Sequence, residues 1–186
     1  MTKAYSVDES GVPDGFSIPN LYSPQVAPDG TTRLLVSASR DVIEDVHKAL
    51  IGVLSAPLGV RYVQLIDRQN ERDQREEPRG FVALNKSPDD VYSSLISARR
   101  LLYDDARCQL WVRGLLGDQI VLDELGMLYA YPDDPGFRKA LSDIGINEGT
   151  AETLADRDFV KVEFESECDG DEAQLIVSLQ MVEVSG

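Results

Sequence analysis

The chain has 186 residues, of which 42% are apolar and 27% are charged, a composition typical of a globular protein rather than a disordered one. It carries 33 Asp and Glu against 18 Lys and Arg, a formal net charge of -15. Nucleic acids and anionic membranes are bound through Lys and Arg that neutralise phosphates, so this charge argues against both as partners. The expected long-range partner is a basic protein.

No membrane span or secretory signal is expected. No apolar run approaches the roughly 18 residues that a span needs, and residues 1–10 lack the apolar core of a signal peptide. Two cysteines, Cys108 and Cys168, and one histidine, His47, are too few for an ordinary metal site. We therefore expect a cytoplasmic protein without metal or other cofactor. The composition leaves the oligomeric state open.

Residues 1–32 are predicted to form an extended N-terminal arm. Prolines and the turn signal Pro28-Asp29-Gly30 interrupt any regular element in this stretch. It nevertheless contains more apolar residues than a linker needs, namely Phe16, Ile18, Leu21 and Tyr22. We expect the arm to dock on the body or on a partner. The body, residues 33–186, is predicted to be a single α+β domain.

The first part of the body reads as two strand-helix-strand units. Strands are expected at 33–38, 60–66, 80–84 and 107–113, with helices starting after Ser39 and Ser87, two good N-cap residues. The resulting order β-α-β-β-α-β is that of ferredoxin-like domains, a match of element order that implies no activity. The expected shared core is Leu34, Val36, Val46, Leu50, Val63, Leu65, Val82, Leu84, Leu95, Leu102, Leu110 and Val112.

The link between the units has arginines at helical spacing, Arg68, Arg72, Arg75 and Arg79. A helix would align them as a basic stripe able to bind an anion. Four neighbouring acids, Glu71, Asp73, Glu76 and Glu77, balance their charge. A salt-bridged, solvated connection is therefore the favoured interpretation.

A β-meander follows, with strands expected at 119–122 and 127–131, then a short helix at 136–144 and a helical turn near 150–155. The chain is predicted to end in a β-hairpin with strands 159–167 and 174–184. The period of two that makes a strand face places Val160, Val162 and Phe164 on one side of the first strand.

The opposite face of that predicted hairpin is the candidate partner site. It aligns Glu163, Glu165 and Glu167 beside a turn that carries Asp169, Asp171 and Glu172. A row of like charges destabilises the free protein and favours a partner that neutralises it. The alternative is a solvated edge strand whose charges prevent aggregation. The turn lacks the ligand spacing of an EF-hand, so calcium is not expected.

Catalytic residues are harder to find. His47 lies among apolar residues of the first expected helix, and a Ser-His-Asp or Cys-His site would have to use it. Paired carboxylates occur at Asp104/Asp105, Asp123/Glu124 and Asp133/Asp134, where turns and helix ends also favour Asp. Tyr129 and Tyr131 share a strand face with Met127 and form the best candidate apolar patch.

The leading functional prediction is a non-enzymatic acidic interaction protein, inhibitor or immunity-like, that masks a basic surface of a partner protein. One alternative is a structural subunit that docks into a larger assembly through its N-terminal arm. The other is an enzyme that acts on a small substrate with carboxylates or His47. A polar pocket would favour the enzyme, and an arm extending from the body would favour the assembly.

Overall fold

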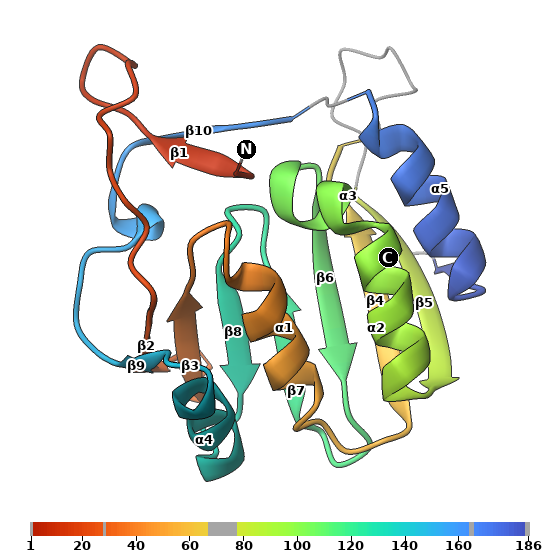
Figure 1. Cartoon of the computed structure of the whole chain (residues 1–186). Helices are drawn as coiled ribbons and strands as arrows, with labels where there is room; N and C mark the ends of the chain where they lie inside the picture. The colour runs from red at the N-terminus through yellow and green to blue at the C-terminus, as the bar shows by residue number, and fades with distance from the viewer. Residues whose placement is uncertain (1, 28, 67–77, 164–165, 185–186) are drawn as a thin grey trace.

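The computed structural model describes residues 2–27, 29–66, 78–163 and 166–184 (Figure 1). Five α-helices and eleven strands lie within these residues. The predicted α+β class is confirmed. Within the described residues, no helix has the length and apolar character to cross a membrane.

The main sheet contains nine strands. In spatial order they are β11 (Val182–Val184), β5 (Arg79–Lys86), β4 (Leu58–Gln64), β6 (Cys108–Arg113), β7 (Gln119–Leu122), β8 (Leu128–Tyr131), β3 (Thr32–Ser37), β2 (Leu21–Val26) and β9 (Asn147–Glu148). Neighbouring strands are antiparallel except β2 and β9. A separate two-stranded ribbon pairs β1 (Ala4–Ser6) with β10 (Phe159–Lys161).

The helices cover one face of this sheet (Figure 1). They are α1 (Ile43–Ile51), α2 (Pro88–Ser97), α3 (Arg99–Asp104), α4 (Pro135–Asp143) and α5 (Cys168–Ser178), and a 3-10 turn, η1, spans Leu154–Asp156. All five helices contribute side chains to one hydrophobic cluster, which also takes alternate residues of the central strands. Leu35 and Val121 are buried but lie outside this cluster, since they face the other side of the sheet.

Helix starts follow from local chemistry. Ser87 caps α2 by accepting a hydrogen bond from the Asp90 amide, and Pro88 occupies the first turn, as predicted. Asp134 caps α4 in the same way through the Gly136 amide. The cap predicted at Ser39 is wrong: α1 begins four residues later, and Ser39 supplies only its carbonyl, which accepts from the Val42 and Ile43 amides.

The order of elements between residues 32 and 113 is strand, helix, strand, strand, two successive helices, strand. The second predicted helix is divided at Ala98 into α2 and α3. In the sheet, β3 and β4 run in the same direction with β6, β7 and β8 between them. The meander β7–β8 is thus inserted within the sheet rather than added at its edge.

Two strands face the core with the alternate set of residues from the one predicted. Val63, Leu65 and Val82 are only half-buried, and Leu84 is 67% exposed. The core instead takes Val60 and Tyr62 from β4 and Phe81 and Ala83 from β5. Both strands carry apolar residues at successive positions, so a period of two does not decide which set points inward.

The predicted C-terminal hairpin is wrong. Residues 168–178 form α5, and only Val182–Val184 return to the sheet, beside β5. One face of α5 carries Cys168, Glu172, Leu175 and Leu179, all buried, at the three- and four-residue spacing of a helix. Cys168 is therefore 2% exposed, and Cys108, on β6, has no exposed surface. Both cysteines are free thiols.

The N-terminal residues are paired with distant parts of the chain. β2 lies in the main sheet between β3 and β9, and β1 pairs with β10 about the register Tyr5–Val160. Of the arginines in the predicted link, Arg68, Arg72 and Arg75 lie outside the described residues. Arg79 starts β5 and forms a salt bridge with Glu183.

We predict that Leu50→Ala destabilises the fold and that Leu84→Ala does not. Leu50 has no exposed surface in the helix-covered core, whereas Leu84 is 67% exposed on the other face of the sheet. Truncating a packed Leu lowers the free energy of unfolding by about 2–5 kcal/mol. Truncating an exposed Leu changes it by less than about 0.5 kcal/mol. Urea titration of both variants measures the difference. Equal midpoints would show that the helix-covered face is not the core.

Candidate functional site

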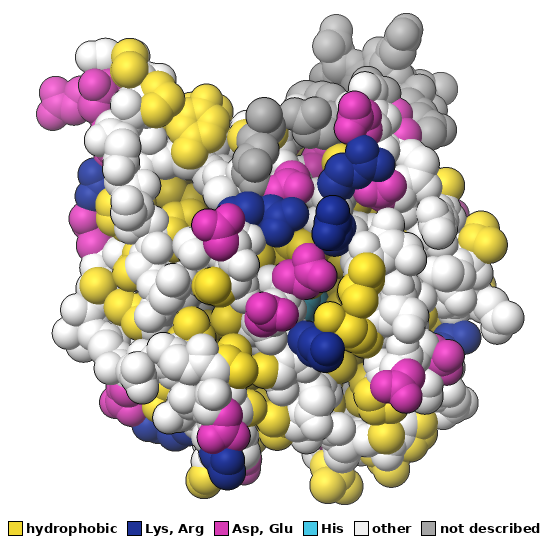
Figure 2. All heavy atoms as spheres, in the orientation of Figure 1, with side chains coloured by type: hydrophobic (Ala, Val, Ile, Leu, Met, Phe, Trp, Pro, Cys, Tyr) yellow, Lys and Arg dark blue, Asp and Glu magenta, His cyan; other side chains and the backbone are white. Residues whose placement is uncertain are grey.

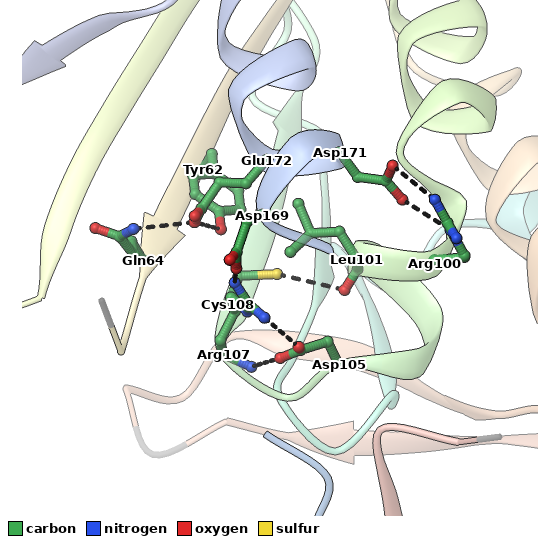
Figure 3. Close-up of polar contacts among 10 residues, drawn as sticks. All are labelled: Tyr62, Gln64, Arg100, Leu101, Asp105, Arg107, Cys108, Asp169, Asp171 and Glu172. Atoms are coloured by element: carbon green, nitrogen blue, oxygen red, sulfur yellow. Dashed lines mark hydrogen bonds and ion pairs between the residues drawn. The ribbon is translucent and has the colours of Figure 1, made fainter. Parts of the chain in front are cut away.

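The carboxylates predicted to bind a partner do not share a strand face. Glu163 is half-buried beyond β10, Glu165 lies outside the described residues, and Glu167 is exposed just before α5. Asp169, Asp171 and Glu172 occupy the first turns of α5. The hairpin geometry proposed for these residues is therefore wrong, and most of those described serve internal contacts (Figure 3).

The deepest of these contacts is centred on Arg107, which is 1% exposed. Its Nη2 donates to Asp105 Oδ2 and its Nη1 donates to Asp169 Oδ1, both at 2.7 Å. Asp105, which is fully buried, also accepts from the Arg107 amide at 2.9 Å. Burial by itself would lower the pKa of the Arg107 guanidinium. The hydrogen bonds that Arg107 donates to both carboxylates outweigh this effect and raise the pKa.

Glu172 forms a second buried contact, with β4. Its Oε1 accepts from Tyr62 Oη and, at 3.0 Å, from Gln64 Nε2 (Figure 3). Burial, followed by the neighbouring Cys108 and Glu172, raises the pKa of Tyr62 well above its usual value, so this phenol stays protonated and donates. Nearer the surface, Arg100 bridges Glu167 at 2.7 Å and Asp171 at 3.3 Å.

These contacts attach α5 to the sheet and to α3. The partners of Glu172 and Asp169 lie 108 and 62 positions away in the chain, at Gln64 and Arg107. No local sequence pattern indicates such pairs. The carboxylates of Asp169, Asp171 and Glu172 are therefore bound within the fold.

His47 is also fully buried. It has no exposed surface, its Nδ1 lies 3.0 Å from Tyr103 Oη, and its Nε2 has no hydrogen-bond partner among the described residues. Burial, and then the charge of Lys3, lower the pKa of His47 to about 3. A neutral imidazole without solvent access cannot contact a substrate in this conformation.

The paired carboxylates have structural partners. Asp104 binds Arg40, Asp133 binds Arg138, and Asp123 accepts from the Leu125 and Met127 amides of its own turn. Burial raises the pKa of Asp123 despite these bonds. The part of the chain that the structure describes contains no group of three or more His, Cys, Asp or Glu residues that could hold a metal ion.

A surface pocket lies beside β1, near the N-terminus, and is here called the N-terminal pocket. It has a volume of about 160 Å³ and is open to solvent. It lies between β1, the segment before β2, the loop that joins β3 to α1, and η1. Its walls include Tyr5, Ser6, Phe16, Ile18, Arg40 and Leu154. Segments more than a hundred residues apart in sequence thus meet in one site, which sequence analysis missed.

Exposed apolar side chains surround this pocket. Tyr5 and Val160 are cross-strand neighbours on the β1–β10 ribbon, and each is 38% exposed. Phe159 is 37% exposed and Val12, on the loop after β1, is 54% exposed. Hydrophobic side chains gather at the upper left of Figure 2, where Figure 1 places β1 and this loop. Contiguous exposed apolar surface of this kind commonly marks a binding site.

Carboxylates border the pocket. We define the acidic rim as Asp14, Asp41, Glu44, Glu152, Asp156 and Asp158, which lie on or next to the segments that line it. Arg157 bridges two of them, Asp14 at 2.7 Å and Glu152, while its guanidinium stacks 4.5 Å from the Phe16 ring centroid. Hydrogen bonds from Ser6 and Arg157 lower the pKa of Asp14 to about 2, so it is ionised at neutral pH.

Arginines lie on the helix-free face of the sheet. Arg61 and Arg113 are exposed there, with Trp111 between them by register. Arg33 stacks 4.4 Å from the Tyr129 centroid and donates to Tyr131 Oη at 2.7 Å. Tyr129 and Tyr131 are thus half-buried on this face, whereas Met127, predicted to accompany them, is 1% exposed.

No protein-family model, curated protein or solved structure matches this chain. Function is therefore inferred from the acidic rim, the arginines on the helix-free face and the pocket. The described residues bring together no nucleophile, base and acid in an open cleft. They do place an apolar pocket beside the carboxylates of the acidic rim.

We predict that Arg107→Ala lowers the free energy of unfolding by about 3–5 kcal/mol, because Asp105 would remain buried without its cation. The matched control is Arg99→Ala, which removes an exposed arginine of α3 and should change stability by less than about 0.5 kcal/mol. Urea unfolding measures both. A cost for Arg107→Ala no larger than that of the control would contradict the role of this contact.

We also predict that His47 makes stability depend on pH. The unfolded imidazole takes up a proton near pH 6.5, whereas the folded one does so only near pH 3, so acidification favours unfolding between these values. Below pH 6.5 the unfolding free energy should fall by about 1.4 kcal/mol per pH unit from this group. His47→Gln should lack that slope between pH 6.5 and 5. Parallel stability curves for the two proteins would contradict the burial of the imidazole.

Proposed function

We propose that this chain is a non-enzymatic acidic interaction protein, inhibitor or immunity-like, that masks a basic surface of a partner protein. The observation that carries the proposal is the segregation of charge in a protein of net charge -15. Carboxylates border an apolar pocket at one end, and arginines line the helix-free face. A basic partner would approach the first surface and avoid the second.

The internal contacts of α5 change where the partner is expected to bind. Asp169, Asp171 and Glu172 form hydrogen bonds with Arg107, Arg100 and Tyr62, so a partner would have to break those bonds to use them. The acidic rim contains carboxylates such as Asp41 and Asp158 that are exposed. We therefore place the proposed contact at the acidic rim rather than at Glu163 and Glu167.

Two observations favour this function over the alternatives. The sealed position of His47 supports binding over catalysis. The pairing of β1 with β10, and of β2 with β3 and β9, holds residues 4–26 against the body, which supports a self-contained binding protein over docking through an extended arm.

The test is affinity capture from the cells that make this protein, with Asp41→Lys and Asp158→Lys, alone and together. Both changes reverse an exposed rim charge and should cost less than about 1 kcal/mol of stability. We expect a basic protein to be captured by the wild type at about 0.1 M salt, and to be lost at about 1 M salt, where the Debye length falls to about 3 Å. The double variant should lose it at low salt.

The matched control is Asp89→Lys. Asp89 is also an exposed carboxylate at a helix start, but α2 begins at the end of the sheet opposite to the start of α1. It should capture the same protein as the wild type. Capture that is equal at low and high salt would reject the proposal. So would capture that is retained by the Asp41→Lys and Asp158→Lys double variant but lost by Asp89→Lys.

A further inference from the structure

We infer that the N-terminal pocket receives one bulky apolar side chain, Phe or Leu in type, from a lysine- or arginine-rich segment of the partner. This inference rests on the proposed function and specifies the part of the partner that is recognised. The pocket would provide the specific contact and the acidic rim the attraction.

The size of the pocket suits one side chain. A buried cavity of about 150 Å³ accommodates a benzene molecule, and this pocket encloses about 160 Å³. Its apolar walls come from Tyr5, Phe16, Ile18 and Leu154. A phenyl ring or a leucine side chain would fill this volume, whereas a nucleotide or an extended peptide would not enter it.

Two of the polar side chains in the walls, Ser6 and Arg40, are engaged with other residues. Ser6 Oγ donates to Asp14 at 2.7 Å and accepts from Arg157 Nε at 2.8 Å. Arg40 donates through Nε and Nη2 to the two oxygens of Asp104. Because these groups satisfy one another, the pocket offers mainly apolar contact, which favours a hydrocarbon side chain over a polar metabolite.

The charge around the pocket selects the neighbours of that side chain. The rim contains six carboxylates, and the bases on the same segments are already bound: Lys3 by the Cys108 carbonyl, and Arg40, Arg157 and Lys161 by carboxylates. A ligand with acidic neighbours would meet repulsion here, and one with Lys or Arg neighbours would meet attraction. Tyr5 and Val160 extend the apolar surface outward along the ribbon, toward the residues that would flank the inserted side chain.

The experiment is a titration of three peptides into the full chain, followed through the backbone amide NMR signals of Tyr5, Phe16, Ile18 and Leu154. The probes are Lys-Lys-Gly-Phe-Gly-Lys-Lys, the same peptide with Ala in place of Phe, and Glu-Glu-Gly-Phe-Gly-Glu-Glu. We expect the first to shift these signals and to bind about tenfold or more tightly than the second, since a phenyl ring gains burial. The third should not bind.

Pocket variants provide the second readout. Ile18→Trp should fill the pocket, and Tyr5→Ala should remove part of its wall. Either change should lower the affinity for the first peptide to that of the peptide with Ala in place of Phe. Leu116→Trp, on the exposed turn between β6 and β7 and not in the pocket lining, is the matched control and should bind as the wild type does. Two pocket variants are used so that one with an unchanged urea midpoint remains for comparison.

The outcomes separate the two proposals. Equal binding of the Phe and Ala peptides would overturn the pocket inference and leave a basic partner supported. Equal binding of the Lys- and Glu-flanked Phe peptides would support the pocket and reject the basic partner. Absence of any shift at the pocket residues, or full binding by both pocket variants, would also overturn the inference.

Discussion

The buried guanidinium of Arg107 is the contact on which the arrangement of this fold depends. Its side chain joins Asp105, at the end of α3, to Asp169, in the first turn of α5, and its carbonyl accepts from the Leu65 and Ile66 amides beyond β4. One residue therefore connects the sheet to two helices. A buried cation with two carboxylates is tolerated only when its hydrogen bonds are well made, so the geometry of all three elements is fixed together.

This constraint explains why the acidity of the C-terminal stretch is misleading as a guide to function. Charge counted along a sequence does not distinguish a carboxylate that binds an internal arginine from one that faces solvent. Asp169 and Asp171 belong to the first kind, and Asp41 and Asp158 to the second. Exposed carboxylates therefore lie on several parts of the described surface, including the segments beside the N-terminal pocket, rather than on a terminal hairpin.

The sequence predicted those elements whose signals are local. The Ser87 cap and the apolar positions Val46, Leu50, Leu95 and Leu102 are where their spacing placed them. It failed where two patterns compete, as in the run from Phe81 to Leu84, whose apolar residues fit either face of a strand. It also failed at α5, because the alternation through Val160 and Val162 was extended into residues whose buried positions repeat at helical spacing.

The candidate site was beyond prediction because no single segment contains it. Its walls come from β1, from residues 16–18, from Ser39 and Arg40, and from Leu154. None of these segments carries a motif, and their meeting depends on β1 pairing with β10 and on β2 pairing with β9. Sequence analysis did identify Phe16 and Ile18 as apolar residues that needed a docking surface, and both line the pocket.

The pairing of β1 with β10 has a consequence for how the protein is made. Ala4 and Lys161 are partners, so β1 leaves the ribosome long before its neighbour β10 has been synthesised. β2 can pair early with β3, but its contact with β9 also requires residues 147–148. Closing such long loops is slow compared with forming hairpins such as β7–β8. Chains that end before β10 would therefore contain much of the sheet but lack the β1–β10 ribbon beside the N-terminal pocket.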